Sequence, residues 1–561
     1  MLLEEVGVHS FGLALIERRV PPPRPGPSRL PGLFFRVVEP KGLEDQEIQE
    51  ISPSRLWPGG HILRLDLRSL ALIRLAYGVL LLWDTVARWG NSSDFYSESG
   101  VLPRHHLLEL DASTGFSLHL LSGSPVWLHS LFLLQVAAAV AMIAGWRTRW
   151  ATLLSWLLLI SIHNRNPLIL DGGDTYLRVI LFWLVFLPTG QRWSMDAKSG
   201  RGDHFRWMPD LTRDCLFGTF ALALLIQISS VYWFAAIPKT DPSWTVTFTA
   251  TDLALHLDMF LTPFGLFFRD TFEQHLPLLT QLGIGWEFWG PALLFFPFDR
   301  GQVRIVGIAG FAALHAGFGM MMELGIFAWV GALTPLVLLP ALFWESAFRR
   351  FSAWADRRLG VSGPVAGDRR LAPVREALVV SLMLYCLAWN WANESCSPDW
   401  LRLPESARWF GRSVQLDQSW QLFAPLPMTD DGWYVIEGRF RDGRVLDLFR
   451  GGEELSWEKP QRVADTYRNQ RWRKYLMNIW LADYSDYRLA YGQYLCHKWN
   501  RNQPEESQLL GFDIIFMLEE TQLDGREKIP EKKTIWEHWC FERSEGSKES
   551  SLGPANRSDN S

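Results

Sequence analysis

The sequence predicts a mainly α protein, in which a polytopic helical membrane bundle is followed by a soluble α+β domain with a small antiparallel sheet. The chain has 561 residues, of which 48% are hydrophobic and 29 are Trp, yet its mean hydropathy is +0.00. A very apolar part must therefore be balanced by a polar one. Apolar runs close to the roughly 20 residues that cross a bilayer recur from Leu70 to Asn390. After about Asp399 the pattern becomes that of a water-soluble domain.

The apolar runs predict about nine membrane spans. We place them near 69–89, 125–145, 150–163, 176–188, 213–236, 277–297, 303–320, 324–344 and 374–392. Basic residues gather in three of the connections, at 147–149, 192–206 and 349–370. The positive-inside rule makes these connections cytosolic. The chain is therefore expected to be a multi-pass cell-membrane protein with a cytosolic N-terminus and an extracytosolic C-terminal domain, and the lipid bilayer is its first partner.

Composition divides the chain into four segments. Residues 1–64 include a Pro/Arg-rich stretch and are expected to form a poorly ordered cytosolic leader. Residues 65–395 form the transmembrane domain and 396–543 the extracytosolic α+β domain. Residues 544–561 are rich in Ser, Gly and Glu, a composition typical of disorder.

The soluble domain contains alternating segments with turn signals. Trp433–Phe440 alternates as a strand, Asp442-Gly443 is a hairpin turn signal, and Arg444–Phe449 alternates back. Two helices, 471–481 and 487–499, and two further strands, 512–518 and 534–541, are expected to follow.

Lys239 stands at the end of an apolar, aromatic segment that reads Q-I-S-S-V-Y-W-F-A-A-I-P-K from Gln227. An ammonium group in this place must reach water or find a partner; otherwise its pKa falls and it becomes a free amine base. Lys239 is therefore a candidate for chemistry. The alternative is an interfacial lysine whose stem lies along the apolar surface while its charge reaches water.

Other polar groups lie in or beside predicted spans. The connection from His163 and Asn164 to Asp174 joins two short spans on the outer side and is expected to dip into the membrane, lining a cavity. The alternative is a plain capped turn with Asp174 as the N-cap of the next helix. Glu287 and His315 lie inside apolar runs, where ionisable groups usually face a cavity or a partner. A single His on a helix can equally be a structural residue.

Charge and cysteine content exclude several classes of function. The net charge is −5, without the concentrated basic face that nucleic-acid binding requires. The five cysteines have neither C-x-x-C nor zinc-like spacing, so neither a metal site nor a disulfide framework is implied.

Several motifs resemble one membrane enzyme family. The stretch V-Y-W-F-A-A-I-P-K-T-D-P-S-W, which includes Trp233 and Asp241, resembles the segment of vitamin K-dependent gamma-glutamyl carboxylases that bears their catalytic lysine. Lys239 falls on that lysine. A helix with His315, followed ten residues later by Gly325-x-Phe327, matches a second carboxylase segment. Q-S-W-Q-L-F-A-P resembles the region after the last carboxylase span, and H-N-R-N-P-L-I-L-D-G-G-D-T-Y-L-R resembles the bacterial HTTM proteins. The resemblance covers roughly residues 65–450.

The resemblance implies quinol chemistry. In the carboxylases an uncharged lysine deprotonates reduced vitamin K, oxygen adds, and the epoxide forms together with a strong base that removes a glutamyl γ-proton. Lys239 would be the base and His315 would act beside it. His163, Asn164, Asp174, Trp233, Asp241, Glu287, Gly325 and Phe327 would contact the substrates. The implied co-substrate is reduced vitamin K or menaquinol, without a metal, and the implied protein partner is a secreted protein or peptide.

One departure from the family narrows this expectation. The carboxylases carry Asn-Asn-His-x-Tyr-Leu, whereas this chain has Gly172-Gly173-Asp174-Thr175-Tyr176-Leu177, so Asp174 replaces a His associated with carboxylation. The sequence therefore supports quinol oxidation better than glutamate carboxylation. The alternative function is non-catalytic: a membrane protein that binds a quinone, lipid or peptide partner.

Overall fold

A computed structural model describes residues 62–110, 115–200, 211, 214–298, 301–365, 368, 370–393, 402–521 and 529–541. These residues all belong to one compact unit, Pro53–Ser561. The leader expected at 1–64, except its last three residues, and the tail expected at 544–561 lie outside the described residues.

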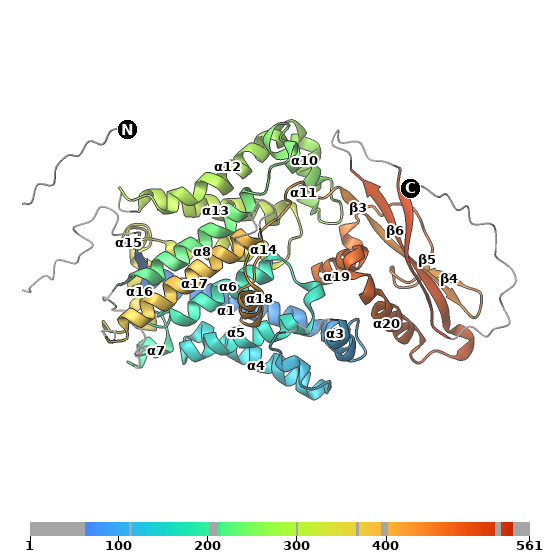
Figure 1. Ribbon diagram of the computed structural model, residues 1–561, viewed down its shortest axis with the longest axis horizontal. Helices are drawn as coiled ribbons and strands as arrows, with labels where there is room; N and C mark the ends of the chain where they lie inside the picture. Colours follow the sequence, from blue (N-terminus) through green and yellow to red (C-terminus); the bar gives the residue numbers. More distant parts are fainter. Residues whose placement is uncertain are drawn as a thin grey trace, which may run out of the picture. The chain divides into compact units, whose positions relative to one another are not determined.

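The described part is mainly helical, and long helices pack side by side (Figure 1). Five helices are long and apolar enough to cross a membrane: α1 Leu67–Gly90, α4 Pro125–Ala144, α8 Thr219–Ala236, α13 Gln302–Met321 and α17 Ala372–Ala392. The other helices at predicted spans are α5 Thr148–Arg165, α6 Gly172–Phe186, α12 Leu276–Leu294, α14 Ile326–Leu333 and α15 Ala341–Glu345. Short helices connect them: α2 Ser92–Phe95, α3 Arg104–Leu110, α7 Met195–Lys198, α9 Pro242–Thr245, α10 Ala250–Leu255, α11 Pro263–Phe272, α16 Arg349–Leu359 and α18 Glu405–Ser413. Antiparallel β1 Arg64–Asp66 and β2 Cys215–Phe217 pair beside the start of α1.

The prediction of about nine spans is therefore not confirmed. α6 has only 15 residues, since its N-terminus is fixed at Gly172 by the cap at Asp171. The predicted span 324–344 is not one helix. α14 passes at Leu333 into the 3-10 segment Thr334–Leu338, and α15 begins only after Pro340. Proline removes a backbone donor and clashes with the preceding turn, and Pro335 and Pro340 account for these breaks.

The strands and helices predicted for the soluble domain are confirmed. The five-stranded antiparallel sheet has the order β5-β4-β3-β6-β7. Its strands are β3 Asp430–Phe440, β4 Val445–Asp447, β5 Glu453–Glu454, β6 Leu509–Glu520 and β7 Glu531–Trp539. β3 pairs with β6 over its whole length, so the centre of the sheet joins segments far apart in sequence.

Two helices, α19 Gln470–Trp480 and α20 Arg488–Asn500, cover one face of this sheet (Figure 1). The Tyr434 hydroxyl on β3 donates to the Leu476 carbonyl at 2.8 Å. The Trp480 ring lies 4.6 Å from the Phe516 ring on β6. The buried face of α19 thus packs on the sheet of its own domain.

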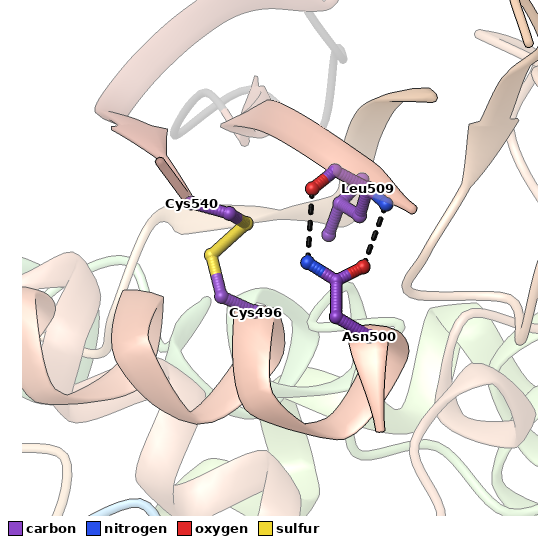
Figure 2. The surroundings of a disulfide bond; sticks show 4 residues. All are labelled: Cys496, Asn500, Leu509 and Cys540. Carbon is purple, nitrogen blue, oxygen red and sulfur yellow. Dashed lines mark hydrogen bonds between the residues drawn. A yellow bond between two sulfur atoms is a disulfide. The ribbon is translucent and has the colours of Figure 1, made fainter. Parts of the chain in front are cut away.

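A disulfide, which the cysteine spacing did not imply, joins α20 to the end of β7. Cys496 and Cys540 lie 44 positions apart in the sequence, and their Cα atoms are 5.4 Å apart (Figure 2). Beside them Asn500 brackets Leu509, donating to its carbonyl at 3.0 Å and accepting from its N–H at 2.6 Å. The packing of α20 on the sheet brings the two cysteines together, which their spacing alone does not reveal.

Candidate functional site

A cavity of about 530 Å³ lies among α8, α10, α12, α13, α14 and the connection at Leu422-Phe423. Its walls are mostly aliphatic, aromatic and glycine residues. Four titratable side chains reach it: Tyr232, Lys239, Glu287 and His315. The volume lies within the 300 to 1,000 Å³ that is usual for small-molecule sites, and an apolar wall with a few convergent polar groups is their usual composition.

Lys239 is positioned by the ends of two helices. α8 ends at Ala236, and Pro238 cannot continue its hydrogen-bond ladder. Asp241 is the N-cap of α9 and accepts the Ser243 N–H at 2.8 Å. Asp241 therefore fixes the turn that holds Lys239, and it does not line the cavity.

Lys239 is only 6% exposed, so its ammonium group is shielded from water and contacts protein groups instead. Its Nζ lies 2.5 Å from Oε2 of Glu287, which is itself buried on α12. Nζ also lies 4.4 Å from the centre of the Trp244 ring, a cation–π distance. The Trp244 indole in turn donates to the Phe423 carbonyl at 3.1 Å. The Lys-x-Asp-x-x-Trp pattern is thus a lysine, the cap that sets its turn and the ring that covers it.

His315 borders the same cavity from α13. Its Nε2 lies 3.2 Å from the Tyr232 hydroxyl, and the Tyr232 ring stacks on Phe311 at 3.9 Å. The imidazole packs against Gly331 of α14, where a Cβ would lie 2.1 Å from the ring. Phe327 lies 5.2 Å from the imidazole and also lines the cavity. Among the described residues, no partner contacts Nδ1 of His315 or the buried indole nitrogen of Trp286.

The remaining predicted site residues lie elsewhere. Trp233 donates to the Phe288 carbonyl at 3.1 Å and stacks on Phe295, outside the cavity lining. Gly325 begins α14 with a φ of 59°, a conformation that favours glycine. A Cβ there would lie 2.6 Å from the Gln470 side chain, so Gly325 permits the close approach of α19.

His163 and Asp174 belong to a second buried group, which we call the ionic cluster: Asp84, Arg88, His163, Asp174 and Arg471. Arg88 forms an i,i+4 ion pair with Asp84 at 2.7 Å, and it also lies 2.5 Å from Asp174. Arg471, from α19, contacts both carboxylates, with 2.9 Å to Asp84 and 2.8 Å to Asp174 Oδ1. His163 Nε2 lies 3.7 Å from Asp174. Two guanidinium groups thus face two carboxylates.

The sequence offered Asp174 as a possible N-cap of the helix that follows, but the structure has a different residue in that position. Asp171, not Asp174, is the N-cap of α6, because its carboxylate accepts the N–H groups of Gly173 and Asp174. Asp174 is the third helical residue and accepts the Asp171 N–H at 2.9 Å, which completes a capping box. Asn164 bonds Phe116 and Gln415, at 2.8 and 2.6 Å.

The structure adds residues that sequence reasoning did not assign to a site. Leu422 and Phe423 close the cavity from the connection that leads to the five-stranded sheet. Arg471 enters the ionic cluster, although it lies 297 positions from Asp174 in the sequence. A run of cations and aromatics on an amphipathic helix was the available signal, but it does not identify the partner.

A further group of carboxylates lies at one end of the sheet. Oxygens of Asp258, Asp431 and Glu519 lie within 4.8 Å of one another. The Lys459 ammonium contacts Asp258 at 2.8 Å and Glu519 at 2.5 Å, so a side chain already supplies a cation to this group. Burial, together with the negative charge of Asp258, raises the pKa of Asp431 to about 7.

No family model matches the chain, and neither the curated proteins nor the solved structures contain a match to it. The function must therefore be argued from the geometry of the cavity.

Proposed function

We propose that this chain is an integral membrane protein of the vitamin K-dependent gamma-carboxylase-like type, which binds a reduced quinone in the Lys239 cavity and oxidises it. The observation that carries the proposal is the cavity itself. Its apolar walls surround one buried Lys–Glu pair, beside a histidine that is hydrogen-bonded to a tyrosine. An apolar molecule with two hydroxyl groups matches this distribution of polar and apolar surface.

The groups present fit a quinol headgroup. The ammonium of Lys239 is a donor and the carboxylate of Glu287 an acceptor, 2.5 Å apart. Flat aromatic walls at Tyr232, Trp244 and Phe327 suit a planar ring.

The Lys239–Glu287 pair is proposed to act as one acid–base unit. Within this apolar pocket, the pair can accept the hydroxyl proton and keep a positive charge beside the resulting oxyanion. His315, held by Tyr232 and Gly331, orients the ring. In the overall reaction one quinol and one O₂ give one quinone epoxide and one water. One oxygen atom enters the epoxide, and the other leaves as water with the two hydroxyl hydrogens.

We propose that the soluble domain lies on the outer side of the membrane. Disulfides persist in oxidising compartments, and the Cys496–Cys540 bond lies in this domain. The basic residues at 147–149, 192–206 and 349–370 give the same orientation by the positive-inside rule. The two arguments are independent of each other.

The test is quinol turnover by the full chain in lipid nanodiscs, with the epoxide measured by chromatography and mass spectrometry. Lys239→Met and Glu287→Gln are expected to lower the rate at least about 100-fold, the usual contribution of a positioned acid–base group. Lys459→Met is the control, because it removes another carboxylate-paired lysine, which is half-buried and lies outside the cavity. Wild-type turnover by Lys239→Met would remove the acid–base assignment.

A second candidate is non-catalytic binding of a quinone, lipid or peptide, favoured by the fact that Glu287 already satisfies Lys239. Quinol binding by the wild type without any epoxide would select it. Glutamate carboxylation of a secreted partner is tested separately, by mass spectrometry of co-expressed secreted proteins. A γ-carboxyglutamate mass shift that disappears in Lys239→Met would extend the proposal to that reaction.

A further inference from the structure

Helix α16 is held to the bundle along one face, which we call its inner face. Nη1 of Arg192 donates to both carboxylate oxygens of Asp356, at 3.1 and 3.0 Å, and the Trp193 indole donates to one of them at 2.8 Å. Ser352 and Ala355 are buried on the same face. These contacts fix the rotation of α16 about its axis, and they leave the opposite face exposed.

The exposed face of α16, which we call its outer face, combines arginine with aromatic side chains. Trp354 is 49% exposed. Three exposed arginines lie three or four residues from it, which places them on the same face of the helix: Arg350, Arg357 and Arg358. Phe351 is 48% exposed, and its ring lies 5.9 Å from the Trp354 ring. The outer face therefore presents cations around two aromatic rings.

The charges of the outer face are not neutralised within the part of the chain that the structure describes. Asp356 is the only acid in the sequence of α16, and it pairs with Arg192 at 3.0 Å on the inner face. None of Arg350, Arg357 and Arg358 forms an ion pair with another described residue. Guanidinium groups bind phosphate oxygens through two parallel hydrogen bonds. The outer face therefore fits a phosphate-bearing partner that also accommodates aromatic rings.

α16 lies at the same end of the bundle as α7 and α15 (Figure 1). The Trp344 ring of α15 lies 5.3 Å from the Trp193 ring, and its indole donates to Ser69, in the first turn of α1, at 2.8 Å. The Asp196 N–H, in α7, donates at 3.0 Å to the carbonyl of Gly145, which caps the end of α4. α1 and α4 are both long and apolar enough to cross a membrane. In a bilayer the ends of such helices meet the headgroup layer, where tryptophan is enriched.

We propose that the outer face of α16 is a binding surface for anionic phospholipids. The arginines contact the phosphate groups, while the rings of Trp354 and Phe351 lie between headgroups, as in helices that lie along a membrane surface. The positive-inside rule places this end of the bundle in the cytosol, and the cytosolic leaflet is the one that carries anionic lipid. The proposal goes beyond crossing a bilayer and beyond the quinone site, because it specifies a class of lipid and the helix that recognises it.

The test is a titration of the detergent-solubilised full chain with a fluorescent phosphatidylglycerol, followed by fluorescence anisotropy. The same titration with phosphatidylcholine measures selectivity for the anionic headgroup. The triple variant Arg350→Gln/Arg357→Gln/Arg358→Gln is expected to raise the dissociation constant for phosphatidylglycerol at least about tenfold. High salt is expected to weaken wild-type binding in the same direction, because the arginines are exposed.

Two further variants show whether the effect belongs to this site. Arginine-to-lysine substitution at the same three positions keeps the charges and is expected to retain most of the selectivity for phosphatidylglycerol. The matched control, Arg441→Gln/Arg444→Gln/Arg501→Gln, removes the same number of exposed arginines from the soluble domain and should bind as the wild type does.

Each outcome decides for or against the lipid surface. Loss of phosphatidylglycerol binding in the α16 glutamine variant alone, with binding retained in the lysine variant, supports the inference. Unchanged binding in the glutamine variant would overturn it, as would equal affinity of the wild type for the two lipids. An equal loss in the soluble-domain control would show an effect of total charge and would also overturn it. Tighter binding of an acidic peptide than of phosphatidylglycerol would assign the surface to a soluble protein instead. Quinol turnover enters none of these measurements, so their outcome is independent of the quinone site.

Discussion

The cavity pair and the ionic cluster are both buried groups of opposite charges, but they differ in what surrounds them. In the ionic cluster, Asp84 and Asp174 are contacted by Arg88 and Arg471 from several directions, and Asp174 also closes a capping box. The Lys239–Glu287 pair instead borders a cavity of about 530 Å³. Charges enclosed by protein mainly fix structure, whereas charges beside open space remain available to a ligand. The ionic cluster and the Lys239–Glu287 pair are both buried, so burial alone does not distinguish a structural site from a functional one.

The largest expected effect is in the ionic cluster. Asp174→Asn leaves two guanidinium groups facing one carboxylate, and breaking a buried ion pair costs about 3 to 5 kcal/mol. We expect a correspondingly large drop in the thermal unfolding temperature of the detergent-solubilised chain. Asp241→Asn is the matched control, because Asn is as good an N-cap as Asp and should change little. A loss below about 1 kcal/mol in Asp174→Asn would contradict the structural role of the cluster.

The three carboxylates of Asp258, Asp431 and Glu519 extend the comparison, because they outnumber the two cations that contact them, Lys459 and Arg269. The folded-state pKa of Asp431, at about 7, lies above that of an unfolded Asp, near 3.9. The folded state therefore binds the proton more tightly, and the resulting stabilisation is present below about pH 4 and lost as the pH rises through about 7.

Asp431→Asn keeps the neutral form at every pH and can still accept the Asp258 N–H, which lies 2.6 Å away. The unfolding temperatures of the variant and wild type should diverge between pH 4 and 8 in favour of the variant. The divergence should correspond to at most about 4 kcal/mol, at about 1.4 kcal/mol per pKa unit. Parallel pH profiles would show that Asp431 is ionised throughout this range.

The cavity pair should tolerate change better than the ionic cluster. Lys239→Met leaves the Glu287 carboxylate beside a cavity that water can enter, so the expected cost is about 1 to 3 kcal/mol. The double variant Lys239→Met/Glu287→Gln removes both charges and should recover part of that loss while remaining inactive. A double-mutant cycle of unfolding temperatures measures the coupling. Zero coupling would mean that the two side chains do not interact in solution.

The smallest effect is expected at an exposed pair. Arg412 and Glu405 lie 3.0 Å apart, with side chains 44% and 73% exposed. Glu405→Gln should change stability by less than about 1 kcal/mol, and less still at high salt. This variant sets the baseline for the unfolding measurements above.

The elements of the soluble domain could be predicted from sequence because their signals are local. The alternation at Trp433–Phe440 and the Asp442-Gly443 turn depend on neighbouring residues, and the structure has β3 and β4 there. The two predicted helices correspond to α19 and α20. The count of about nine spans is not confirmed, for the opposite reason. The apolar run 324–344 is interrupted by prolines that break the helix. Counting spans by apolarity does not take such breaks into account.

The site was accessible to sequence reasoning only in part. Lys239, Glu287, His315 and Phe327 were each selected, by an isolated charge in an apolar segment or by a motif, and the fold brings all four to one cavity. His163 and Asp174 were selected on similar grounds but lie in the ionic cluster. The pairing of Lys239 with Glu287, and the entry of Arg471 between two aspartates, join positions 48 and 297 residues apart. No local pattern specifies such contacts.

The sequence by itself therefore determined the main helices and strands of the sheet domain, the apolar composition of the helical part and the identity of the unusual charged residues, because each follows from nearest neighbours. Only the tertiary structure decided which of those charges are enclosed and which border open space. It also decided that Cys496 meets Cys540. The physical reason is that enclosure depends on how distant segments pack, and packing is a property of the folded chain as a whole.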